Sequence, residues 1–110
     1  MSWDQTGIYN WQCSTFGETA LWPAFERFQQ EYFEFRDKLH AYVHNVQTTR
    51  ADDIGARNEI TFEMADMYIT MVRVAGLLGT NILQAVDEKM DVNEAREWNV
   101  GPDGNGQHVE

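Results

Sequence analysis

Five polar residues with helical spacing lie in and just before an otherwise apolar segment, and their types suggest metal chemistry. They follow one another at steps of four, three, four and three residues, which places them on one face of an α-helix: Glu59, Glu63, Asp66, Thr70 and Arg73. The remaining positions up to Leu78 are almost all apolar, so the helix is expected to be largely buried. Buried carboxylates repel one another unless a cation compensates them, and Arg73 can neutralise one at most. We therefore predict a bound divalent metal ion and a candidate active site on this helix.

A second carboxylate pair lies upstream, where Glu31 and Glu34 are three residues apart and share a helix face. These two side chains could belong to the same site. They could equally form solvated surface ion pairs, because Arg27–Glu31 and Glu34–Lys38 both have four-residue spacing. The spacing alone leaves both interpretations open.

A third group is cationic and polar, and it lies near the end of the chain. Lys89, Asn93 and Arg96 step by four and three residues and extend the row that Ile82 and Val86 begin. The row is either a frayed, solvent-facing helix end or a cradle for phosphate, since guanidinium and ammonium groups both bind phosphate oxygens.

The elements that must position these groups are helices. A short helix is predicted over Asp4–Ser14, capped by Asp4, with Ile8 and Trp11 facing inward, and residues 15–21 form a connector. Pro23 suits a helix start. Apolar residues then recur at spacings of three and four and predict a long amphipathic helix, through Phe25, Phe28, Tyr32, Phe35, Leu39, Tyr42 and Val46.

Residues 48–58 are predicted to form a loop before the apolar helix, which Asn58 or Thr61 would cap and Gly76 with Gly79 would end. Thr80 or Asn81 is expected to cap a last helix that runs to about Trp98. The Gly-rich tail after it is expected to be loose unless a partner subunit orders it.

The absence of any segment with strand periodicity predicts an all-α fold, an antiparallel helical bundle. A chain of 110 residues suits one domain with a modest core. Its expected parts are an N-terminal helix and connector (1–21), a helical core (22–98) and the Gly-rich tail (99–110).

The composition of the chain limits the kinds of partner that it can bind. The net charge of −10 argues against nucleic acid or an anionic membrane as a partner, although a small anionic substrate remains compatible if metal ions mask the local field. The lone Cys13 suits a reducing cytosol, and the polar start of the chain does not resemble a signal peptide. The apolar run is too short and too rich in carboxylates to span a bilayer. We expect a cytoplasmic protein.

Taken together, these motifs resemble the MazG-like nucleoside triphosphate pyrophosphohydrolases. Glu31-Tyr-Phe-Glu34, a gap of 28 residues and Glu63-Met-Ala-Asp66 match the two-part carboxylate motif of that family. The downstream residues Lys89, Asn93, Arg96 and Trp98, and the turn Leu78-Gly79-Thr80-Asn81 before them, also look like the family. One position departs from the pattern, because Gln30 stands where the family motif usually begins with a glutamate.

Two further segments narrow the resemblance to small phage-type dATP/dGTP pyrophosphohydrolases, the MazZ type. They are Trp11-Gln12-x-x-Thr15-Phe16-Gly17 and the tail Asp103-Gly104-x-Gly106-Gln107-His108.

The resemblance implies a metal-dependent hydrolysis of a nucleoside triphosphate, with dGTP or dATP as the expected substrate, between its α- and β-phosphates. Glu31, Glu34, Glu63 and Asp66 would hold Mg²⁺ or Mn²⁺, with two or more ions per site, because oxygen ligands suit these hard cations. One carboxylate, Glu34 or Glu63, would orient or deprotonate the attacking water.

The same resemblance assigns the substrate-binding residues and a partner. Lys89, Asn93 and Arg96 would bind the phosphates, and Trp11 and Phe16 would form walls for the base unless they are ordinary core residues. Members of the family pair their helices between subunits, so a homodimer or homotetramer is expected.

One alternative from another class is a non-catalytic acidic helical adaptor, or an oligomerisation module, whose carboxylates are solvated and whose aromatic residues bind a partner helix. That interpretation gives no reason for Glu63 and Asp66 to lie in an apolar helix.

Overall fold

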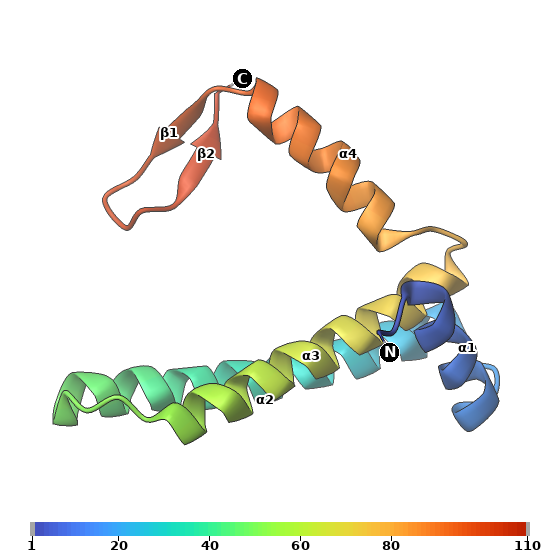
Figure 1. The fold of residues 1–110 in the computed structure, drawn as a ribbon, viewed down its shortest axis with the longest axis horizontal. Helices are drawn as coiled ribbons and strands as arrows, with labels where there is room; N and C mark the ends of the chain where they lie inside the picture. Colours follow the sequence, from blue (N-terminus) through green and yellow to red (C-terminus); the bar gives the residue numbers. More distant parts are fainter. Residues whose placement is uncertain (1, 110) are drawn as a thin grey trace. The chain divides into compact units, whose positions relative to one another are not determined.

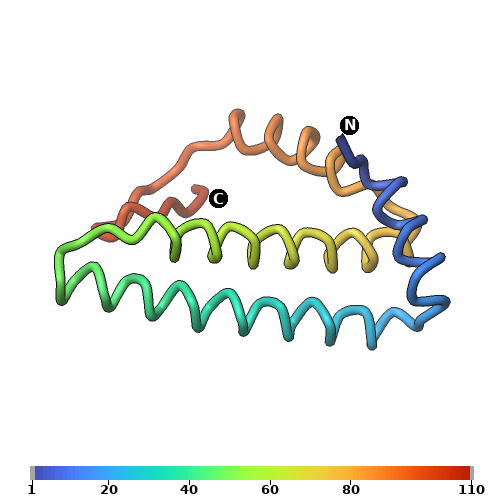
Figure 2. Tube along the Cα trace, turned by 60° about the horizontal axis from the view of Figure 1, so that its bottom comes forward, coloured from blue at the N-terminus to red at the C-terminus, as the bar shows by residue number. Residues whose placement is uncertain are grey.

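The computed structural model describes residues 2–109, which form two compact units, one reaching to Thr80 and one starting at Asn81. In the first unit, α1 (Gln5–Phe16) is followed by α2 (Leu21–Thr49) and α3 (Ile54–Leu77). Helices α2 and α3 run side by side in opposite directions, and α1 packs on α3 at the end of this hairpin where α2 begins (Figures 1 and 2). The hairpin therefore brings the two carboxylate motifs onto facing helices.

The predicted helices are present, and their ends follow their caps. Asp4 caps α1 as expected, because its side chain accepts a hydrogen bond from the Gly7 amide at 2.8 Å. The predicted caps of α3 were wrong: its N-cap is Asp53, which accepts from the Ala56 amide at 3.0 Å. The loop between α2 and α3 is accordingly shorter than the predicted 48–58 and comprises residues 50–53.

A tyrosine and an arginine hold this short loop closed. The Tyr42 hydroxyl donates to one Asp52 oxygen at 2.8 Å, and Arg57 pairs with the other at 2.9 Å. Arg50 ends α2 in the left-handed conformation at φ 57°. Of the other residues expected in the loop, 48–49 belong to the end of α2 and 54–58 to the start of α3.

The apolar core of the chain is small. Its buried apolar residues are Ala24, Ile60, Val72 and Ala75. The expectation that the apolar helix is largely buried is wrong for the single chain, since Phe62 is 74% and Met64 53% exposed. Helix α3 packs on α1 and α2 and still leaves apolar surface uncovered.

Helix α1 is attached to α3 by polar contacts as well as packing. Trp11 is 46% exposed rather than inward-facing, and the buried positions of α1 are Gln5 and Gln12. Gln5 Nε2 donates to the Thr80 carbonyl at 2.7 Å, and Gln12 Nε2 donates to a carbonyl of α3. Close packing requires a glycine on the other side of the contact, because a Cβ atom at Gly76 would collide with the Tyr9 ring. The docking of α1 thus depends on residues that hydropathy would not select.

The second unit contains α4 (Ile82–Ala95) and a hairpin of β1 (Trp98–Val100) and β2 (Gly106–His108). Asn81, one of the two predicted caps, accepts from the Gln84 amide at 3.0 Å. The strands are antiparallel, with Trp98 opposite His108.

The β1–β2 hairpin shows that two expectations were wrong, namely that the chain has no strands and that its tail is loose. Asp103 accepts from the Asn105 amide at 3.1 Å, and Gly104 adopts φ 84°, so the turn is specified locally. Each strand has only three residues, which is too short for a period-of-two signal. The last helix also ends at Ala95, before the predicted Trp98.

Among the described residues, no single helix is long and apolar enough to cross a membrane.

Candidate active site

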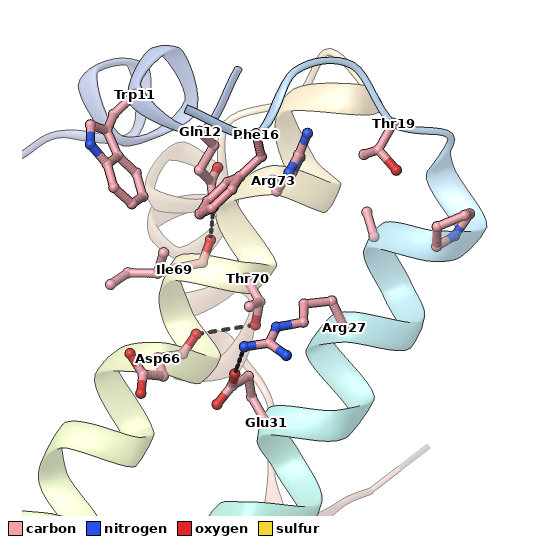
Figure 3. Close-up of a pocket in the computed structure, with 12 residues that line it drawn as sticks. Trp11, Gln12, Phe16, Thr19, Arg27, Glu31, Asp66, Ile69, Thr70 and Arg73 are labelled. Atoms are coloured by element: carbon pink, nitrogen blue, oxygen red, sulfur yellow. Dashed lines mark hydrogen bonds and ion pairs between the residues drawn. The ribbon is translucent and has the colours of Figure 1, made fainter. Parts of the chain in front are cut away.

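Three of the four motif carboxylates converge between α2 and α3. Glu31 comes from α2, and Glu63 and Asp66 come from α3, one turn apart. Each offers an oxygen that lies within 4.8 Å of the others. Figure 3 shows Glu31 and Asp66 on facing helices. The antiparallel hairpin therefore brings Glu31 close to Glu63 and Asp66, across the 28-residue gap between the two halves of the motif.

Glu31 is the most deeply buried member of this cluster, at 4% exposure. One carboxylate oxygen pairs with Arg27 at 2.7 Å, whereas Oε2 is buried and lacks a hydrogen-bond partner among the described residues. Burial raises the pKa of Glu31; Arg27 opposes this, and repulsion from Glu34 and Asp66 adds to it. The predicted Arg27–Glu31 pair forms, but its acid is not a solvated surface group.

Glu63 repeats this arrangement on α3. Its Oε1 accepts from the Lys38 ammonium at 2.6 Å, and its Oε2 is buried without a partner among the described residues. The hydrogen bond to Glu63 raises the pKa of Lys38. The alternative surface pair Glu34–Lys38 is not the one observed, because the Lys38 side chain reaches across to α3 instead.

Glu34 lies at the margin of the cluster. Its side chain is exposed, and it is not among the three carboxylates whose oxygens converge. Its charge nevertheless contributes to the raised pKa of Glu31. It is therefore adjacent to the cluster and available to it.

The donor set fits a divalent cation. Four carboxylates with two paired cations leave a formal charge of −2 when all are ionised, the charge that one divalent ion balances. Two of the oxygens are buried acceptors without a donor, an unfavourable state that a cation would relieve. An all-oxygen set suits Mg²⁺ or Mn²⁺.

A cavity of about 510 Å³ opens beside the cluster and is chemically divided. Glu31 and Asp66 line one end, and Trp11 and Phe16 line the other (Figure 3). The two aromatic rings meet edge to face with centroids 5.4 Å apart. This division, acidic at one end and aromatic at the other, suits a ligand with a metal-bound phosphate group and a flat base.

Two arginines line the same cavity, and their contacts differ from the expectation for Arg73. Arg73 donates to the Gly17 carbonyl, and its guanidinium lies 5.7 Å from the centroid of the Phe16 ring. The cation that pairs with a cluster carboxylate in the cavity is Arg27, which Gln30 also holds at 3.0 Å. The residue that departs from the family motif thus helps to fix a cavity cation.

Lys89, Asn93 and Arg96 belong to the second unit. Lys89 is exposed on α4, and Asn93 is half-buried, with no hydrogen-bond partner for its Oδ1 within residues 2–109. Arg96 follows the helix as its C-cap in an extended conformation, so it leaves the helical row that the spacing predicted. Their phosphate-binding role stays a prediction.

Three residues of the site were not predicted from the sequence: Arg27 as a cavity cation, Lys38 as the partner of Glu63, and Gln12 as a buried cavity residue. The four-residue spacing from Arg27 to Glu31 was a signal for the first. Pairing of Lys38 with a residue 25 positions away left no local signal.

The chain is similar to one curated protein over part of its sequence. A dATP/dGTP diphosphohydrolase of Salmonella phage PMBT28 is 45% identical over 47 residues, which is 43% of this chain. The chain spans only 16% of the length of that relative. No protein-family model matches the chain.

A solved structure matches nearly the whole fold. It is the cyanophage S-2L MazG-like pyrophosphohydrolase bound to dGDP and three catalytic Mn²⁺ ions per active site. The TM-score is 0.63 at 23% identity, and the match covers 96% of this chain and 89% of the other. The MazG-like resemblance and the all-α fold class are confirmed by these comparisons.

Proposed function

We propose that this protein is a metal-dependent nucleoside triphosphate pyrophosphohydrolase, which cleaves its substrate between the α- and β-phosphates. The products would be a nucleoside monophosphate and pyrophosphate. The observation that carries the proposal is the carboxylate cluster, with two buried oxygens that lack donors, at the acidic end of a cavity whose other end is aromatic. The phage relative and the MazG-like neighbour support it by their names.

The residues that would hold Mg²⁺ or Mn²⁺ are Glu31, Glu63 and Asp66, with Glu34 at their margin. When bound, such ions lower the pKa of a water molecule and stabilise charge on phosphate oxygens. The three Mn²⁺ ions of the cyanophage structure support more than one ion per site. Glu34 or Glu63 would orient the water or accept its proton, and Lys38 would hold one Glu63 oxygen in place meanwhile.

The rest of the cavity would bind the substrate. Trp11 and Phe16 offer flat apolar surfaces for a base, and Arg27 and Arg73 offer guanidinium groups for phosphate oxygens. Aromatic walls favour a purine by their area alone, and the names of both similar proteins refer to purine nucleotides. We infer dGTP or dATP as the substrate, with Lys89, Asn93 and Arg96 as further phosphate ligands.

The adaptor alternative explains less of the site. An adaptor needs solvated carboxylates, whereas Glu31 is only 4% exposed. It pairs with Arg27, and both residues line the cavity. Keeping such a group buried lowers the stability of the fold. A binding site needs the buried group for its function, whereas an adaptor surface does not.

Self-association is part of the proposal. Large apolar side chains remain exposed on α3, among them Phe62, Met64, Met71 and Leu78. A second copy would cover them, and we infer a homodimer or homotetramer. Analytical ultracentrifugation at micromolar concentration should give a mass above 12.8 kDa, and Phe62→Glu should shift it toward that of one chain. A fully active monomer would contradict this inference.

The function is tested by product analysis. Each canonical deoxy- and ribonucleoside triphosphate is incubated with the protein and Mg²⁺ or Mn²⁺, and the products are separated by anion-exchange chromatography. Monophosphate plus pyrophosphate from dGTP or dATP supports the proposal, and chelation of the metal should abolish it. Stepwise release of orthophosphate, or a clear pyrimidine preference, would overturn it.

A further inference from the structure

Gln12 is a buried polar side chain that has only one of its two polar ends satisfied. It is 3% exposed and lines the cavity. Its Nε2 donates to the Ile69 carbonyl of α3 at 2.8 Å, whereas its Oε1 is buried without a hydrogen-bond partner among the described residues. A buried acceptor without a donor is unfavourable, so its retention in a cavity wall points to a donor that arrives with a ligand.

The contact with Ile69 also fixes which end of the amide faces which way. A carbonyl oxygen accepts hydrogen bonds, so the group beside it must be the NH₂ donor of the amide. Rotating the amide by half a turn would set two acceptors against each other. The free group of Gln12 is therefore an acceptor, and a ligand must present an N–H or O–H to it.

The position of Gln12 indicates what kind of ligand brings that donor. Two other residues of α1, Trp11 and Phe16, line the same cavity. Their side chains are 46% and 62% exposed, and their rings meet edge to face. Figure 3 shows Gln12, bonded to Ile69, beside both rings. The acidic residues Glu31 and Asp66 line the opposite end. A ligand that packs its flat face on the rings would turn its edge to the buried acceptor.

We propose that Gln12 Oε1 reads the base by accepting a hydrogen bond from an exocyclic amino group of a purine. This inference rests on the proposed function, because it takes the cavity as a nucleotide site. An aromatic wall discriminates weakly between bases of similar size. A buried acceptor discriminates strongly, because a base without the amino group leaves it unpaired and desolvated. Gln12 is thus the specificity-determining residue of the cavity, and the aromatic residues supply area.

The test compares substrates that differ by one amino group. The pairs are dGTP with dITP, which lacks the 2-amino group, and dATP with purine deoxyriboside triphosphate, which lacks the 6-amino group. For the wild type, kcat/KM should be at least about tenfold higher for the amino-bearing member of one pair. Which pair responds identifies the amino group. In Gln12→Met, which has a similar shape and no acceptor amide, that ratio should fall toward one.

A matched control separates base reading from helix docking. Gln5 is also a buried glutamine of α1 and also donates to a main-chain carbonyl, that of Thr80, but it does not line the cavity. Gln5→Met should lower the melting temperature much as Gln12→Met does and leave the substrate ratio unchanged. Circular dichroism confirms that each variant keeps its helices. A wild type that treats both pairs alike, or a Gln12→Met variant that keeps the ratio, would overturn the proposal.

A binding measurement separates failure of this inference from failure of the proposed function. The affinities of dGMP and dIMP, and of dAMP and purine deoxyriboside monophosphate, are measured by calorimetry for the wild type and Gln12→Met. A preference that is lost in the variant supports base reading even if no triphosphate is hydrolysed. Hydrolysis without any amino-group preference, in turnover or in binding, would sink the role of Gln12 and leave the proposed function standing.

Discussion

Two carboxylate sites on the α2–α3 hairpin are built in opposite ways. At the loop end, Asp52 accepts a hydrogen bond from Tyr42 and pairs with Arg57, and the Tyr42 bond in particular lowers its pKa. Nearer α1, Glu31 is buried beside other carboxylates, and burial raises its pKa. Both acids have a cationic partner, yet of the two only Asp52 has a hydrogen-bond donor at each oxygen among the described residues.

The difference separates a structural acid from a candidate ligand. Asp52 is surrounded by donors, so its charged form is stabilised and it fastens a loop. Glu31 and Glu63 each keep a buried oxygen that no donor in the described part of the chain reaches. An ion pair alone therefore does not distinguish the two kinds of site, whereas the unpaired second oxygen does.

The largest expected effect comes from removing the charge of a carboxylate in the candidate metal site. Glu63→Gln should reduce triphosphate hydrolysis by more than about 100-fold, the upper end of the loss seen for outer-shell partners of metal ligands. Helix content should survive, because the amide keeps the size of the side chain. Steady-state kinetics and circular dichroism measure both effects. Asp52→Asn is the matched control and should stay within a fewfold of wild-type turnover; near-normal turnover of Glu63→Gln would refute the assignment.

A moderate effect is expected when a metal ion is added. Binding to the native state at 100 times the dissociation constant stabilises it by about 2.7 kcal/mol, so Mn²⁺ should raise the melting temperature by several degrees. Asp66→Asn should lose most of this rise, since its oxygen belongs to the cluster. Asp52→Asn should keep it. An equal metal-induced rise in all three proteins would mean that the ion binds elsewhere.

The smallest expected effect is a pair of opposite pH dependences in the metal-free protein. The lowered pKa of Asp52 contributes stability above the pKa of an unfolded aspartate, and this contribution is lost as pH falls through the folded value. The raised pKa of Glu31 contributes stability below the pKa of an unfolded glutamate, and this is lost as pH rises through the folded value.

Urea midpoints between pH 3 and pH 7 measure this pair. Asp52→Asn should be less stable than the wild type near pH 7 and should converge with it in acid. Glu31→Gln should be more stable than the wild type near pH 7, and the two proteins should become equally stable in acid. Parallel curves for the two variants would show that the sites do not differ as described.

The sequence predicted what depends on local periodicity and missed what depends on pairing across helices. The three-and-four spacing located α2, α3 and the carboxylates of both motifs, because helix geometry converts spacing directly into faces. The start of α3 was missed because Asp53 competed with later caps that were equally plausible. The partner of Lys38 and the burial of Gln12 arise only when separate helices meet, and no local pattern encodes them.

The close contact between Gly76, which has no side chain, and the Tyr9 ring has a consequence for how the protein can evolve. Any mutation that gives residue 76 a side chain must displace the Tyr9 ring and so disturb the packing of α1, which carries Trp11, Gln12 and Phe16, while the acids on α2 and α3 lie outside this contact. Random mutants should therefore divide into two phenotypes. Lesions at the acids would silence the protein, whereas lesions at position 76 would leave it able to hold metal but indiscriminate among nucleobases. One glycine, outside the cavity lining, would thus govern how readily descendants of this chain drift to new substrates.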